Sequence, residues 1–461
     1  MYRFSFLLAA LWLSACSQTA EFHRPPAPIP EAWPEAIHGN GTRAVSKTHW
    51  RTFFTDPQLQ TLIATALEHN RDLRIAAARV EEARAQYGVV RADKVPSVNL
   101  LGTGSVVQTP ASLSATGVAT TSSRYDLSVS SVSFELDFWG RIAGLTEAAR
   151  VSYLATEESR RAVYLSLVAD VASSYFTLMQ MNELMAFARS TVASREKSLA
   201  VIASGLAAGG TYDYEFQQAR GLFESAQVSL DGISHQRAVA LNHLSFLVGY
   251  GPVELLEERT LEQQGLDADL TIGLPSEVLL VRPDVMAAEQ RLIAAHANID
   301  AARAAFLPKV LLSAGIGAAS QGLAGLFAGG VWSFQPTITL PLFDGGRVAA
   351  VVDVAEARKV IAVAEYEKTI QQAFREVADL LSARTSFVRQ LRASTANAAA
   401  QAKRLEIAQA RYQAGLISYL EILDGQRDLV AAEEMSIQVR RAQLASAAQL
   451  YKALGGGLGY Q

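Results

Sequence analysis

Cysteine is nearly absent from this chain. Cys16 is the single cysteine among 461 residues, so no disulfide can form within the protein. Charged residues are also scarce, at 19%, whereas hydrophobic residues make up 50% of the sequence. That composition is typical of a membrane protein, yet no apolar run approaches the ~20 residues that a spanning helix needs. If the chain enters a membrane, it must do so by another route.

Signals for catalysis, metal binding and nucleic-acid binding are missing as well. The seven histidines show no metal-ligand spacing such as HExxH, and six methionines are too few for a copper-binding array. The paired glycines lack the Lys and Ser/Thr context of a phosphate-binding loop. With a net charge of −4, the chain has no basic field for nucleic acid. We therefore expect no cofactor, no metal, no enzyme activity and no nucleic-acid partner.

The N-terminus has the pattern of an export signal. Arg3 precedes the short apolar stretch "FSFLLAALWLSAC", which predicts a signal peptide over residues 1–15. The stretch ends in a lipobox-like "LSAC", so we expect Cys16 to become the lipidated first residue; the alternative is an incidental thiol. Ser17 follows it, as in lipoproteins that are sorted to the outer membrane. The proline-rich residues 22–34 predict an extended segment that leads away from this anchor.

The rest of the chain is duplicated. Asp72 precedes Pro96 by 24 residues. Asp284 precedes Pro308 by the same distance, at an offset of 212. Two further pairs recur in the same order at offsets of 206 and 207: "FELDFWGRI" with "ITLPLFDGGRV", and "TYDYEFQQAR" with "SYLEILDGQR". Three landmarks in one order at nearly one spacing indicate two copies of one unit.

The duplication sets the predicted domain boundaries. These are a signal peptide at 1–15, a lipid anchor with an extended segment at 16–56, a first repeat at 57–249, a linker at 250–283, a second repeat at 284–454 and a tail at 455–461. Each repeat is expected to contain a helix, a β-hairpin, a very long helix and a further helix. The expected bounds are about 97–138 and 308–343 for the hairpins, about 141–204 and 347–414 for the long helices, and about 212–247 and 418–454 for the last helices.

The long helices are the best-defined elements of the sequence. Neither Gly nor Pro occurs over 145–204 or 347–414, which are 60 and 68 residues long. Each helix would measure roughly 90–100 Å at 1.5 Å per residue. Apolar residues step by three and four, as in coiled coils. The residues of these stripes are Leu178, Met181, Met185, Ala188 and Val192, and then Ile370, Phe374, Val377, Leu381, Val388 and Leu391.

The hairpins have a different period. Trp332 and Phe334 alternate with Ser333 and Gln335, and the strand from 309 follows the same two-residue rule. An apolar face opposite a small or polar face is typical of a transmembrane β-barrel. The apolar phase flips within 125–138, which predicts a bulge or the exit from the membrane. Four strands cannot close a barrel in lipid, so either no membrane barrel forms or several copies share one. Three copies would supply twelve strands.

The chain resembles the TolC-like outer membrane factors, and specifically the lipoprotein branch of OprM-like (NodT-type) efflux channels. The matching segments include "FELDFWGRI", "LPSEVLLVRPDVMAAEQRL", "FLPKV", "WSFQPTITLPLFDGGR" and "YLEILDGQR". The resemblance implies a mixed α and β membrane protein, in which a homotrimer forms a twelve-stranded barrel that continues into a periplasmic α-barrel. It also implies an equatorial collar that includes 250–283, a location in the outer membrane, a periplasmic adaptor (membrane fusion) protein, and an inner-membrane pump of the proton-driven RND type. Such channels export small molecules such as drugs.

The turn before the last helix carries the candidate gate. Glu421 and Asp424 are three residues apart, so both lie on one side of a helix, and trimerisation would gather six carboxylates around one axis. They match the acidic constriction of the family, and Tyr412 matches its tip tyrosine. The simpler alternative is a helix start with Ser418 as its N-cap. A catalytic pair is disfavoured because no acid/base partner is signalled. The expected gate-supporting residues are Arg411, Ile417 and Arg427.

The two turns have diverged, and this limits the resemblance. TolC has an arginine at the position of Ile417, so its salt-bridged latch is not expected here. The sequence alignment pairs Glu421 with Tyr214, so the acid ring is expected from the second copy alone. Both turns, around Gly210 and Gly415, are either adaptor contacts or solvated loops.

Two other classes of protein compete with the channel. A lipid-anchored coiled-coil scaffold or adhesin explains the long helices but neither the alternating hairpins nor the duplication. A periplasmic hydrolase would use the two carboxylates of the last turn, but the sequence gives no sign of a catalytic pocket. The efflux channel accounts for all of these features.

Overall fold

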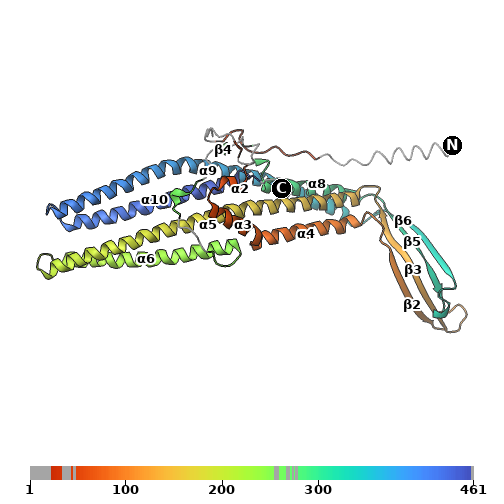
Figure 1. Cartoon of the computed structure of the whole chain (residues 1–461). Coiled ribbons are helices and arrows are strands. Elements are labelled where there is room, and N and C mark those ends of the chain that lie inside the picture. Colours follow the sequence, from red (N-terminus) through yellow and green to blue (C-terminus); the bar gives the residue numbers. More distant parts are fainter. Residues whose placement is uncertain are drawn as a thin grey trace. The chain divides into compact units, whose positions relative to one another are not determined.

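The computed structural model of the chain describes residues 22–33, 43–44, 48–253, 259–265, 270–271, 275 and 279–457. Cys16 and the predicted signal peptide lie outside these residues. Within the described part, helices and four long strands confirm the expected mixed α and β fold (Figure 1). The sequence order of helix, two strands, long helix and helix occurs twice, as the duplication predicts.

The first copy begins with a short capped helix that the sequence analysis did not separate. Asp56 accepts a hydrogen bond from the backbone N–H of Gln58 at 2.9 Å, and Pro57 occupies the first turn. The elements of this half are α2 (Trp50–Phe53), α3 (Pro57–His69), α4 (Arg71–Ala92), β2 (Asn99–Thr109), β3 (Thr120–Leu136), α5 (Arg141–Ala207) and α6 (Asp213–Val248).

The second copy has the same plan. Its elements are α8 (Pro283–Ala304), β5 (Lys309–Ser320), the short η3 (Leu323–Gly325), β6 (Gly330–Thr339), α9 (Arg347–Gln413) and α10 (Tyr419–Ala453). Both α5 and α9 are 67 residues long. The linker between the copies contributes η2 (Leu261–Gln263) and β4 (Leu270–Thr271), which pairs in parallel with β1 (Arg43–Ala44).

The compact units of the structure do not coincide with the two sequence repeats. Each unit takes corresponding parts from both copies. Unit 1 comprises Met1–Pro26, Arg79–Glu157 and Ala287–Tyr366, and unit 2 comprises Ala27–Ala78, Glu158–Met286 and Glu367–Gln461.

Unit 1 contains one antiparallel sheet with the strand order β2-β3-β5-β6. Ile316 lies opposite Trp332, and their side chains are 69% and 79% exposed. On the other face Ser313 lies opposite Gln335. The predicted alternation is therefore present, with one face of exposed apolar side chains and one of small and polar side chains. Strands β2 and β6 each pair with a single neighbour, which leaves both edges of the sheet open.

The predicted change of phase in the second strand is a β-bulge. The register of β3 against β5 shifts between Ser131 and Phe134, and Ser133 has a φ of 56°. Before the bulge Val129 lies opposite Ile316, and after it Phe134 lies opposite Leu312. One extra residue thus keeps the apolar side chains on the same face of the sheet.

Capping carboxylates start both long helices where the strands end. Asp344 accepts from the backbone N–H groups of Gly346 at 2.9 Å and Val348 at 2.8 Å. Asp137 does the same for the first turn of α5. Gly346 has a φ of 86°, a left-handed conformation that glycine adopts without strain. The "FDGGR" stretch is therefore a strand-to-helix turn.

The core of unit 2 joins its N-terminal segment to the end of the chain. Tyr175 donates to Asp56 at 2.8 Å. Tyr451 donates to the backbone oxygen of Thr48 at 2.9 Å and stacks on Phe53 at a centroid distance of 4.7 Å. These tyrosines are buried, so each hydroxyl needs the partner it has.

The helical stripes are only partly buried in the single chain. Leu178 and Ile370 are fully buried, as predicted, whereas Val388 is 54% exposed. By length and composition, α5 contains an 18-residue stretch apolar enough to cross a membrane, but 61% of that stretch is buried inside the chain. A core helix has the same properties, so this stretch is not evidence for a transmembrane helix.

Candidate functional site

The turn between α9 and α10 is closed by a glycine. Gly415 has a φ of 72°, and its N–H donates to the oxygen of Tyr412 at 2.9 Å. The N–H of Leu416 donates to the oxygen of Arg411 at 3.0 Å. This pair of bonds is the usual helix ending around a left-handed residue. Arg411 thus contributes its backbone to the turn, while its side chain is exposed.

The corresponding turn of the first copy has the same geometry at a neighbouring residue. The left-handed residue is Gly209, with a φ of 74°, and Gly210 follows it. The N–H of Gly210 donates to the oxygen of Gly205 at 2.9 Å. Gly209 is therefore the counterpart of Gly415, and Gly210 is the counterpart of Leu416.

The helix starts revise the alignment of the two copies. Helix α6 begins after Tyr212 and α10 begins after Ser418, an offset of 206. Glu215 is then the third helical residue of α6, and Glu421 is the third of α10. The sequence alignment with Tyr214 was wrong by one position. An acid therefore occupies the same place in both turns.

The two candidate gate acids have different surroundings. Glu421 is exposed in the first turn of α10, after Ser418, whose side chain makes no capping bond. Asp424 lies one turn further on, beyond the first turn, and pairs with Arg427 at 3.5 Å. The helix-start explanation therefore fits Glu421 but not Asp424. Both acids remain on the side of the helix that residues three apart share.

Arg427 belongs to an ionic cluster that links α9 to α10. It lies 3.3 Å from Asp428, and Arg404 of α9 donates to the same carboxylate at 2.7 Å. The hydrogen bond from Arg404 is the main reason why the pKa of Asp428 lies below its ordinary value. The sequence analysis missed Asp428 and Arg404. The "GQRD" stretch offered a signal, since its last residue follows Asp424 by four and so lies on the same side of the helix.

An aromatic pair closes the base of the turn. The rings of Tyr412 and Tyr419 meet edge to face, with centroids 5.1 Å apart at 75°. Burial raises the pKa of Tyr419 above its ordinary value, against the effect of a hydrogen bond with Ser198 of α5. Ile417, between the two rings in sequence, is half-buried. The predicted tip tyrosine thus contacts the start of α10 within its own chain.

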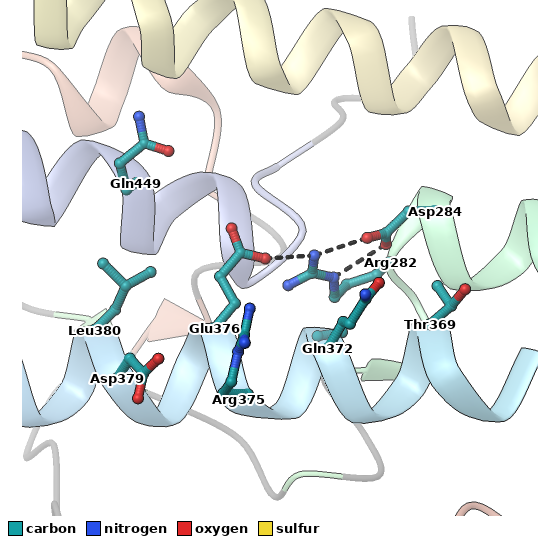
Figure 2. A pocket seen from close by; sticks show the side chains of 10 residues that line it. Arg282, Asp284, Thr369, Gln372, Arg375, Glu376, Asp379, Leu380 and Gln449 are labelled. Carbon is teal, nitrogen blue, oxygen red and sulfur yellow. Dashed lines mark hydrogen bonds and ion pairs between the residues drawn. The ribbon is translucent and has the colours of Figure 1, made fainter. Parts of the chain in front are cut away.

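A second charged centre lies where the linker meets α8, and Figure 2 shows it. Arg282 is 6% exposed and donates two hydrogen bonds to Asp284, at 3.0 and 2.7 Å. It also donates to Glu376 of α9 at 2.8 Å and to the backbone oxygen of Ala453 at 2.8 Å. These four bonds use four of the five guanidinium N–H groups. One side chain therefore joins the linker, α8, α9 and the end of α10.

A pocket surrounds the ion pairs of Arg282. Its volume is about 480 Å³, and beside the ion pairs it is lined by polar residues such as Gln372 and Gln449 (Figure 2). No group of three or more potential metal ligands occurs among the residues that the structure describes. The bonds of Arg282 instead indicate a structural anchor. The sequence analysis quoted "VRPD" but gave it no role.

A sheet with an exposed apolar face, two helices of 67 residues and an acid-bearing helix turn together indicate a class of protein, the membrane channels. The family model of the outer membrane efflux proteins matches residues 62–250 and 274–456. The chain belongs to this family. It is an outer-membrane efflux channel, and its family is one of transport channels.

Known relatives match over nearly their whole length. The chain is 41% identical to outer membrane protein OprJ of Pseudomonas aeruginosa, over 98% of this chain and 95% of OprJ. It is 44% identical to the toluene efflux pump outer membrane protein TtgF of Pseudomonas putida, over 96% and 95%. The crystal structure of the open MtrE outer membrane channel of Neisseria gonorrhoeae is similar, with a TM-score of 0.87 at 35% identity, covering 96% of this chain and 99% of MtrE. These findings favour the channel over the scaffold hypothesis.

Proposed function

We propose that three copies of this chain form a passive exit duct across the outer membrane. The observation that carries the proposal is the four-stranded sheet with two open edges and an exposed apolar face. Unpaired backbone groups are too costly in lipid, so the edges need partners. Joining β6 of one copy to β2 of the next pairs all edges and gives twelve strands.

The strand lengths suit a membrane. Strands β2 and β6 have 11 and 10 residues, and a tilted transmembrane strand needs about 9–11. The apolar side chains, among them Trp332 and Phe334, would face lipid. The face of Ser313 and Gln335 would line the interior. A covalent lipid on Cys16 would add a second anchor, and no other cofactor is proposed.

In this duct the acids of the last turn form the periplasmic gate. Three copies would place six carboxylates, from Glu421 and Asp424 of each copy, around one axis, which favours cations over anions. Tyr412 closes the base of each turn, and Arg427 offsets part of the charge of Asp424. Glu215 is at the equivalent helix position in the first copy, so three copies would add three further acids at the turns before α6.

The proposed partners supply the energy for export, which the chain has no site to provide. The sequence holds no nucleotide site, so the energy for export must come from a partner. We assign that role to an inner-membrane pump of the proton-driven RND type, reached through a periplasmic adaptor protein. The relatives are named for toluene efflux and cation efflux, and small molecules such as drugs are the proposed cargo here. The duct itself would carry out no catalysis.

Two neighbouring residues on opposite faces of β6 test the membrane assignment. Phe334→Lys places a charge on the apolar face, at a cost of about 2–4 kcal/mol near the membrane centre. Gln335→Lys places the same charge on the polar face. We expect the first variant to lose trimers that resist SDS in outer-membrane fractions, and the second to keep them. Equal assembly of both variants would contradict the proposal.

The adaptor contact is tested at the two turns. A photo-crosslinking amino acid at Gly210 or Leu416, both exposed, should trap the adaptor in intact cells. The same amino acid at exposed Val228, far along α6 from its turn, is the control. No product at either turn would leave these loops as solvated connections.

A further inference from the structure

A groove lies beside the sheet in unit 1, between α5, α8 and α9. Its volume is about 650 Å³, within the range of 300–1,000 Å³ typical of small-molecule sites. Apolar side chains such as Leu145, Ala302 and Val351 form much of its wall. A smaller hollow of about 240 Å³ shares Ala355 and Arg358 with it and extends it along α9.

The charges that line the groove are all positive. They are Arg141, Lys309, Arg347 and Arg358, and no carboxylate is among the lining residues. Arg141 is neutralised by Glu135 through two hydrogen bonds of 2.8 and 2.6 Å. Among the residues that the structure describes, the other three cations have no carboxylate within ion-pair distance. The groove thus combines an apolar wall with three uncompensated positive charges.

The position of the groove can be assigned from the sheet. Lys309 lies opposite Thr339, and Glu135 lies opposite Leu311, both on the face of Ser313 and Gln335. The groove therefore opens on the polar side of the sheet. If the proposed trimer forms, that side lines the interior of the duct, so the groove would be reached by exported molecules and not by lipid.

We propose that this groove is an interior binding site for organic anions with an apolar body. Its wall suits an aromatic or aliphatic group, and its cations suit a sulfonate, carboxylate or phosphate. Three copies would form a belt of nine cations, at the opposite end of α9 from the acidic turn. The site places amphiphilic anions among the molecules that pass through the duct, and it rests on the proposed function.

The test uses two probes that differ in charge. Full-length protein in nanodiscs is dialysed to equilibrium against 2-naphthalenesulfonate or the uncharged 2-naphthalenesulfonamide, with empty nanodiscs as the blank. The test variant is Lys309→Gln/Arg347→Gln/Arg358→Gln. The control variant, Lys368→Gln/Arg375→Gln/Arg389→Gln, removes three cations of α9 that lie outside the groove.

The wild type and the control should bind the sulfonate alike, and the groove variant at least about tenfold more weakly. Binding of the sulfonamide should be weak and equal in all three proteins. Equal sulfonate binding by the wild type and both variants would overturn the proposal. The absence of sulfonate binding by the wild type would also overturn it, and this result is expected if a segment of a neighbouring copy fills the groove. Conductance of the same samples separates the two proposals, because a conducting channel without sulfonate binding leaves the duct intact. A chain that forms no pore contradicts the duct itself.

Discussion

The anchor at Arg282 gives the sharpest prediction about stability. Its guanidinium is 6% exposed and holds two carboxylates and one backbone oxygen. Arg282→Met keeps much of the side-chain volume but removes all four hydrogen bonds. Asp284 and Glu376 then remain as two like charges close together. Exposed Arg375, which lines the same pocket without an ion pair among the described residues, provides the control Arg375→Met.

The expected loss follows from the burial of this centre. Breaking a buried ion pair costs about 3–5 kcal/mol when the charge left behind is buried. Asp284 and Glu376 are 40% and 32% exposed, so water would solvate part of their charge and the expected cost is at the lower end, about 3 kcal/mol. An unfolding entropy of about 2.1 cal/mol/K per residue corresponds to roughly 1 °C for each kcal/mol in a chain of 461 residues, so the unfolding temperature should fall by roughly 3 °C. The unfolding temperature of Arg282→Lys should lie between those of the wild type and Arg282→Met, because an ammonium keeps the charge but loses the planar fork of the guanidinium.

Thermal unfolding of the helices can be followed by circular dichroism at one scan rate, because unfolding of an assembled membrane protein is rarely reversible. The control should unfold within about 1 °C of the wild type, as expected for an exposed charge. If Arg282→Met and Arg375→Met lowered the unfolding temperature equally, the anchor would carry no special stability. The physical reasoning about this centre would then be wrong.

Three further predictions concern the same unit. Burial would raise the pKa of Asp284, but the hydrogen bond and charge of Arg282 lower it below its ordinary value. The stabilisation by this carboxylate is therefore complete above its unfolded pKa of about 3.9 and is lost as the pH falls further. Acid unfolding should show this loss of stability in the wild type, and Asp284→Asn should remove the pH dependence. Gly415→Ala should destabilise the turn by about 1 kcal/mol because of its positive φ, whereas Gly210→Ala should not, as limited proteolysis of the turns can measure. Tyr451→Phe should cost about 0.5–1.5 kcal/mol in thermal unfolding, because it removes one of the two hydrogen bonds that the oxygen of Thr48 accepts, while the N–H of Gly457 still donates to that oxygen at 2.9 Å.

The elements of this fold could largely be predicted from the sequence, because they follow local patterns. The two-residue alternation of β5 and β6 and the absence of Gly and Pro from α5 and α9 are visible without any contact information. Even the bulge in β3 leaves a local sign, since the apolar phase flips there. The open edges of the sheet also follow from the strand count.

The two turns, before α6 and before α10, were predicted less well, because turn geometry depends on single residues. A sequence alignment at an offset of 207 is one residue from the true helix starts, and it hid the equivalence of Glu215 and Glu421. The left-handed glycine of the first turn is Gly209, which the sequence does not distinguish from Gly210. Whether the gate acids act as a selective ring depends on three copies and stays a prediction.

The anchor could not be predicted from the sequence, because its partners are distant. Arg282 bonds to Glu376 and to the backbone of Ala453, which are 94 and 171 residues away. Only Asp284 lies nearby, and the pair resembles an ordinary helix start. Cys16 lies outside the described residues, so its lipidation also stays a prediction.

The most direct test of the channel account is the ion selectivity of the purified protein in a planar bilayer. The variants are Glu421→Gln/Asp424→Asn at the turn and Glu433→Gln/Glu434→Gln further along α10, which removes the same charge. We predict a small, cation-selective conductance for the wild type and the control, and a larger or less selective conductance for the turn variant. A conducting wild type whose selectivity is the same in all three proteins would contradict the account and leave the two acids as parts of a helix start.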